Sequence, residues 1–304
     1  MTAVGRRRRR ILLILYVILL VPSTIVRHSI SQPILPKRMR AVSLPEVNKN
    51  RATAVRIKLA FADTDAGSAS MPVVLVHGSP GSSHIFGELT VMLSGQFRVI
   101  VPDLPGFGAS THALPDYSFR AHARYIIELL DALHISKAQF VGFSMGGGVV
   151  LSIADIAPER VASIVMLSAI GVQEQELLGN YYANHLLHGL QLGGLWLLRE
   201  GVPHFGVLDD VELNVEYARN FYDSDQRPLR SVLQNFRGPM LIIHGTRDPL
   251  VPIAAANEHH SLVPQSKLRI LDDNHFMVFQ RPFVLIQPLQ EFLERTMHTT
   301  HLVN

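Results

Sequence analysis

Short runs of β-branched and aliphatic residues alternate with helical patterns along most of the chain. Runs typical of buried strands occupy 73–76, 98–101, 138–142, 161–167, 240–244 and 267–271, and an earlier strand is expected within 55–61. Between them, apolar residues recur at helical spacing, as in 118–133, and further helices are expected from Met145 to about Asp155 and over 282–295. This alternation predicts an α/β fold with a mostly parallel central sheet flanked by helices.

The stretch from 171 to 238 breaks the alternation. It contains no buried-strand pattern, but it has helical patterns around 177–190 and 211–222 with glycines between them. Because it interrupts the core, 171–238 is predicted to form a helical cap, and the core then comprises 52–170 and 239–304. The cap is rich in leucine around Trp196. Two interpretations stay open, ordinary helix packing or a pocket for an acyl chain.

The N-terminus has the pattern of a targeting segment. Five arginines, Arg6 to Arg10, precede an apolar run over 11–26, which is closed by Arg27. Residues 1–27 are therefore predicted to be a membrane anchor or a signal segment, with an uncleaved anchor preferred. Positive charges stay on the cytoplasmic side, so the body is expected on the extracytoplasmic side. The alternative is a secreted or periplasmic protein, cleaved after the small residues Ser29 and Ser31. Residues 28–51, with three prolines, are interpreted as a linker or as an arm lying on the body.

The charge balance changes once the N-terminus is set aside. The whole chain carries a net charge of +3, but residues 52–304 hold 17 Lys and Arg against 24 Asp and Glu, a net charge of −7. A nucleic-acid partner is therefore not expected, because it requires a basic face on the folded body. The chain has no cysteine, which excludes disulfides, thiolate catalysis and zinc held by cysteine. No metal or cofactor is predicted.

A G-x-S-x-G pattern, Gly142-Phe-Ser-Met-Gly146, lies where a predicted strand gives way to a helix. A turn this sharp holds its central residue in strained backbone geometry, and the glycines let strand and helix approach closely. Ser144 is thereby predicted to be an exposed nucleophile above a helix N-terminus, which favours developing negative charge.

From about Arg56 to Arg295 the chain resembles the α/β-hydrolase superfamily. His77-Gly-Ser-Pro-Gly81 resembles its oxyanion loop, Asp103-Leu-Pro-Gly-Phe-Gly108 a characteristic turn, and Gly142 to Gly146 its nucleophile elbow. The resemblance implies an oxyanion hole made by the backbone N–H groups of Ser79 and Met145, and a structural role for His77.

The order of the other catalytic residues in this superfamily is acid and then histidine. His275 lies in the loop after the last predicted strand and is the expected base, whereas His244 precedes the acid and is the runner-up. Asp248, in His244-Gly-Thr-Arg-Asp248-Pro, follows a strand and resembles the family's acid loop. A carboxylate there fixes the tautomer of the histidine and stabilises its charged form.

A serine nucleophile indicates acyl transfer. We expect a serine hydrolase that works through an acyl-enzyme, foremost a carboxylesterase acting on a small apolar ester. The alternatives are a carbon–carbon bond hydrolase or an acyltransferase of the same fold, and a catalytically silent binding protein.

Overall fold

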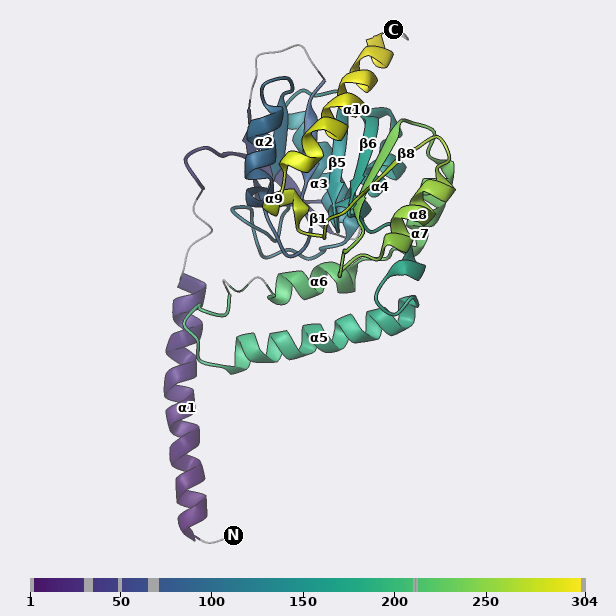
Figure 1. Ribbon diagram of the computed structural model, residues 1–304. Coiled ribbons are helices and arrows are strands. Elements are labelled where there is room, and N and C mark those ends of the chain that lie inside the picture. The colour runs from purple at the N-terminus through teal and green to yellow at the C-terminus, as the bar shows by residue number, and fades with distance from the viewer. Residues whose placement is uncertain are drawn as a thin grey trace.

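The computed structural model describes residues 3–29, 35–48, 51–64, 71–209, 211 and 213–301. Its strands form one eight-stranded sheet in the order β1-β2-β4-β3-β5-β6-β7-β8 (Figure 1). They are β1 Arg40–Asn48, β2 Arg51–Asp63, β3 Val73–Val76, β4 Val99–Pro102, β5 Ala138–Phe143, β6 Val161–Leu167, β7 Met240–Gly245 and β8 Lys267–Leu271. Strands β3 to β8 pair in parallel, while β1 and β2 add an antiparallel edge. The predicted fold class is confirmed.

Helices cover both faces of the sheet, because the buried strands are apolar on both sides. In β3, Val73 and Leu75 pack into one core cluster, and Val74 and Val76 pack into the other. The first cluster is closed by α2 Gly87–Leu93, α9 Met277–Gln280 and α10 Phe283–His301. The second is closed by α3 Phe119–Ala132, α4 Gly146–Ile156, α7 Arg227–Asn235 and α8 Ile253–Leu262. Among the described residues, short 3₁₀ turns lie at η1 Ser83–Phe86, η2 Pro158–Arg160 and, after β6, η3 Gln173–Gln175.

Residues 28–51 were interpreted as a linker or as an arm lying on the body. The linker is wrong for Arg40–Asn48, which form β1 and lie on the body, so the body begins at Arg40. Leu44 and Val47 of β1 are buried in the core, and the Val47 N–H donates to the Tyr125 hydroxyl of α3 at 2.8 Å. Pro45 is tolerated because β1 is an edge strand, with an irregular register between Pro45 and Val47. Of the predicted linker, residues 30–34 and 49–50 lie outside the described residues, as does part of the suggested cleavage site.

The segment inserted after β6 is helical, as expected. It contains α5 Tyr181–Gly201 and α6 Val215–Asp223, which pack on each other beside the sheet (Figure 1). The predicted boundary at 238 is wrong, however, because α7 belongs to the body. Its Leu229 and Leu233 are buried in the core cluster with α4 and α8.

Helix α1 Ala3–Ser29 extends away from the body (Figure 1). It has 27 residues, about 40 Å at 1.5 Å per residue. Among the described residues it is the one helix long and apolar enough to cross a membrane. Its apolar side chains are exposed on all sides, which agrees with an anchor or a signal segment.

Candidate active site

Ser144 lies in the tight turn between β5 and α4. Its φ of 52° is in the left-handed region, which is strained for a residue with a side chain. The two flanking glycines make the turn possible. A Cβ at Gly146 would lie 2.2 Å from the carbonyl oxygen of Val76, and one at Gly142 would lie 2.6 Å from the carbonyl oxygen of Gly146. The geometry is that of the predicted nucleophile elbow.

His275 and Asp248 meet although 27 positions separate them in sequence. His275 follows β8, Asp248 follows β7, and these strands pair in parallel, so their carboxyl ends lie together. The His275 Nδ1–H donates to Asp248 Oδ2 at 2.7 Å. Because this carboxylate oxygen accepts the proton on Nδ1, Nε2 of the neutral imidazole is left as a proton acceptor.

Asp248 is held in place from two sides. Its side chain is fully buried, and Oδ1 accepts the N–H groups of Leu250 at 2.9 Å and Val251 at 2.8 Å. Burial acts to raise the pKa of the Asp248 carboxyl, but the hydrogen bond and charge of His275 and the two N–H groups outweigh it. The pKa therefore lies below its ordinary value, and Asp248 is a carboxylate at neutral pH.

His244, the runner-up base, lies behind the acid. Its Nε2 is 2.9 Å from the Val251 carbonyl oxygen and 3.6 Å from Asp248 Oδ2. Burial lowers its pKa, against the opposing effects of the Val251 carbonyl and Asp248. His244 supports the acid loop and lines neither of the cavities described below.

The loop after β3 is fixed next to Ser144 by buried polar groups. The Leu104 N–H donates to Nε2 of His77 at 3.0 Å, and Nδ1 of His77 lies 2.7 Å from the Gly78 carbonyl oxygen. Asp103 accepts the Ser83 N–H at 2.7 Å. Gly78 has to be glycine, since a Cβ there would approach Cβ of Ser144 to 2.9 Å. His77 therefore has the structural contacts expected of it.

The two expected oxyanion donors lie on either side of this contact. Met145 is the N-cap of α4, and Ser79 follows Gly78. Within the described part of the chain, neither backbone N–H donates to another backbone group. Both are therefore available to an oxygen atom of a bound substrate, at a helix N-terminus that favours negative charge.

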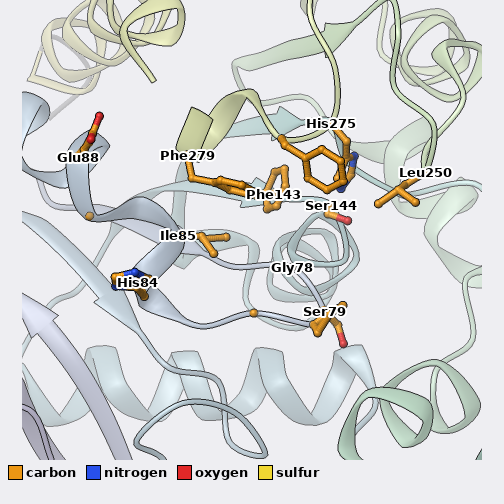
Figure 2. Close-up of a pocket in the computed structure, with 14 residues that line it drawn as sticks. Gly78, Ser79, His84, Ile85, Glu88, Phe143, Ser144, Leu250, His275 and Phe279 are labelled. Carbon is orange, nitrogen blue, oxygen red and sulfur yellow. The ribbon is translucent and has the colours of Figure 1, made fainter. Parts of the chain in front are cut away.

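Two cavities meet at Ser144. One, of about 680 Å³, is lined by Ser144 and His275 together with Phe143, Phe276, Phe279 and Ile85. Figure 2 shows Ser144, His275, Phe143, Phe279 and Ile85 around this cavity. The other, of about 310 Å³, extends from Ser144 under the cap and is lined there by His188, Leu213, Tyr217 and Phe221. Ser79, Pro80, Ser144 and Leu250 line both cavities. A molecule bound across Ser144 would therefore have one part in each.

The cap supplies different residues from those the sequence suggested. Trp196 is 54% exposed and lines neither cavity. An acyl pocket built around Trp196 is therefore wrong. The alternative, that Trp196 is buried by ordinary helix packing, is wrong as well. His188 of α5 is buried and lies 3.2 Å from Glu176 Oε1. Phe276 and Phe279 were missed, although Phe276 directly follows the expected base and Phe279 lies four residues after it.

Comparisons with known proteins agree with this fold. The sequence profile of the α/β-hydrolase fold matches residues 71–190. The 2-hydroxy-6-oxo-2,4-heptadienoate hydrolase of Pseudomonas putida is 28% identical over 264 residues, which cover 75% of this chain and 91% of that protein. An esterase of Thermogutta terrifontis has a similar structure, with a TM-score of 0.67 at 23% identity, over 85% of this chain and 99% of that one.

The chain belongs to the α/β-hydrolase superfamily. Another similar member is the uncharacterized hydrolase YugF of Bacillus subtilis, which is 27% identical over 246 residues, covering 73% of this chain and 89% of that protein.

Proposed function

We propose that this α/β hydrolase cleaves uncharged, apolar carboxylic esters through an acyl-enzyme on Ser144. The observation that carries the proposal is the position of Ser144. It lies in a strained turn where two cavities meet, and it lines one of them together with His275, which is bonded to Asp248.

In this reaction Nε2 of His275 takes the proton from Ser144 Oγ as the oxygen attacks the acyl carbon. The N–H groups of Ser79 and Met145 receive the negative charge that develops on the carbonyl oxygen. His275 then gives its proton to the leaving alcohol, and Ser144 keeps the acyl group. A water molecule, activated by His275 in the same way, releases the acid and restores Ser144.

The cavity walls support an uncharged substrate. Among the described residues that line the two cavities, none is Lys or Arg, while Glu88 and Glu176 are present. A carboxylate on the substrate would find no lysine or arginine there and would lie near acidic side chains. The aromatic and aliphatic residues instead favour apolar groups on both sides of the ester bond.

The test is a series of p-nitrophenyl esters of increasing acyl length. Each methylene that becomes buried contributes about 0.8 kcal/mol, or roughly fourfold in kcat/KM, until the cavity is filled. Ser144→Ala should abolish the activity, and Ser83→Ala, at a serine that lines neither cavity, should keep it. A profile that does not change with acyl length would contradict the apolar substrate, and full activity in Ser144→Ala would contradict the nucleophile.

Hydrolysis of a carbon–carbon bond next to a carbonyl is the second candidate, because of the similarity to the Pseudomonas putida hydrolase. The substrate in that protein's name is a carboxylate, for which the cavity walls here offer no lysine or arginine among the described residues. We therefore rank the ester first. If the purified protein cleaved such a dienoate faster than every ester tried, this order would be reversed.

We also propose that α1 is an uncleaved anchor that holds the body on the extracytoplasmic side of the membrane. The apolar run over 11–26 follows five arginines, and basic residues remain in the cytoplasm. The test is to determine the N-terminus of the protein in the membrane fraction. An intact N-terminus supports the anchor, and a new one near Gln32 would show a cleaved signal.

A further inference from the structure

The outward face of α5 is apolar, while its inward face carries the polar side chains. Outward lie Tyr182, Leu186, Leu190 and Leu197, each at least 64% exposed, which recur four or seven residues apart and so form one stripe along the helix. The side chains of α5 that are buried are Asn184 and His188. A helix on the surface of a soluble protein has the opposite arrangement.

The apolar surface continues past the end of α5. Trp196 and Leu198 lie beside the stripe, and Val202, Phe205 and Val207 follow it, all 40% exposed or more. We refer to the four stripe residues together with these five as the α5 face. A contiguous apolar surface of this kind on a folded protein marks an interaction site.

Hydrogen bonds tie one end of this face to α1. The Tyr16 hydroxyl donates to the Gly201 carbonyl oxygen at 2.6 Å. Further along α1, the Ser23 hydroxyl oxygen accepts the N–H groups of His204 at 3.0 Å and Phe205 at 2.8 Å. Tyr16 and Ser23 both lie within the apolar run of α1, so the end of α5 lies at the depth of that run.

Ion pairs of Arg27 hold the cap against α1 where the apolar run of α1 ends. Arg27 bonds to Asp209 at 2.8 Å and to Glu200 at 3.2 Å, and its side chain is 5% exposed. From Tyr16 to Arg27 the contact with α1 extends over about 16 Å of helix. Figure 1 shows α5 running across the direction of α1. When α1 crosses a bilayer, α5 therefore lies along the plane of the membrane, near one surface.

We propose that the α5 face is inserted into the same lipid bilayer that α1 crosses, so that the cap rests in the membrane surface. An interfacial helix of this kind buries its apolar face about 5–10 Å into the boundary between headgroups and acyl chains. The lipid is the occupant we infer, rather than a second copy of the chain, because the face is continuous with α1. The inference rests on the proposed anchoring by α1 and is independent of the proposed esterase activity.

The test uses the full-length chain in phosphatidylcholine vesicles, with a fluorophore on one cysteine at a time. The chain has no cysteine of its own, so each label reports a single position. Leu190→Cys and Leu197→Cys test the α5 face. Ile14→Cys, on α1, is the reference for lipid. Val91→Cys is the reference for water, because Val91 is a 73% exposed apolar residue on α2, in the body away from α5 (Figure 1).

We expect the labels at Leu190 and Leu197 to be quenched by nitroxide-labelled lipid as strongly as the label at Ile14, and to be protected from iodide. Quenching by iodide, as at Val91, would overturn the proposal. Protection from both quenchers would overturn it too, because another protein, such as a second copy, would then cover the face. If the Ile14 label is not quenched by the nitroxide-labelled lipid, α1 does not cross the bilayer, and the proposal fails because it rests on that anchor. Ester hydrolysis measured on the same samples reports separately on the proposed function.

Discussion

Replacing Asp248 with asparagine tests how the acid contributes to the reaction. The asparagine side chain has nearly the same shape, and its oxygen can still accept the N–H groups of Leu250 and Val251. Its amide group, however, would face Nδ1 of His275 as a donor. That imidazole would then accept at Nδ1 and carry its proton on Nε2, where a base for Ser144 needs a free lone pair.

The magnitude follows from the 2.7 Å separation of His275 Nδ1 and Asp248 Oδ2. Two unit charges at that distance attract by about 6 kcal/mol at an effective dielectric constant of about 20. The positive charge on His275 forms as the imidazole takes the proton from Ser144, so most of this energy lowers the barrier. A loss of about 5.5 kcal/mol corresponds to roughly 10⁴-fold in kcat.

The assay is hydrolysis of a p-nitrophenyl ester by the wild type and the variant, with circular dichroism to show that the fold is retained. Asp272→Asn is the matched control, because Asp272 is near in sequence to His275 but its side chain is 84% exposed. The control should keep the wild-type rate. A kcat of the Asp248→Asn variant within about tenfold of the wild type would refute the assigned role.

Three further predictions concern other parts of the account. Gly146→Ala should lower the free energy of unfolding by about 1–3 kcal/mol and reduce activity, since its Cβ would lie 2.2 Å from the Val76 carbonyl oxygen; an unchanged Tm would contradict this crowding. Burial lowers the pKa of His122 to about 3 and of His259 to about 4. The two histidines therefore take up protons at a higher pH in the unfolded chain than in the folded one. As the pH falls below about 6.5, each histidine should lower the free energy of unfolding by about 1.4 kcal/mol per pH unit. His259→Gln should weaken that dependence in denaturant titrations, and an equal slope in the variant would exclude His259 as a source. Trp196→Ala should leave kcat/KM for a soluble ester unchanged, because Trp196 lines neither cavity. A decrease in kcat/KM confined to esters with long acyl chains would show instead that Trp196 contacts the substrate.

The sequence contains local signals for most of the body and for the candidate triad. The strand 161–167 is found with the predicted bounds, because a buried parallel strand has to be apolar on both faces. The strand 267–271 also has the predicted bounds, although it is partly exposed at the edge of the sheet. Ser144 was found through a turn that tolerates only glycine on either side. His275 and Asp248 were found through their order after strands. Their catalytic roles stay predictions, although the structure brings the two side chains together.

Other features depend on long-range contacts that leave no local signal. β1 contains Pro45 and an irregular register, so its sequence has no alternating pattern, and its position is fixed by packing against β2 and α3. The leucines of α5 predict a helix, but composition alone does not tell which side of that helix faces the protein. The cavity walls come from separate loops and helices, which only the assembled fold brings together around Ser144.

The central claim is that Ser144 is an activated nucleophile, and covalent labelling tests it most directly. A fluorophosphonate reacts with a serine hydroxyl only where a base activates it, and intact-protein and peptide mass spectrometry locate the adduct. We expect one adduct per chain, on the peptide that contains Ser144, formed slowly in His275→Ala and not at all in Ser144→Ala. A wild-type protein that stays unlabelled, or an adduct that persists in Ser144→Ala, would contradict it.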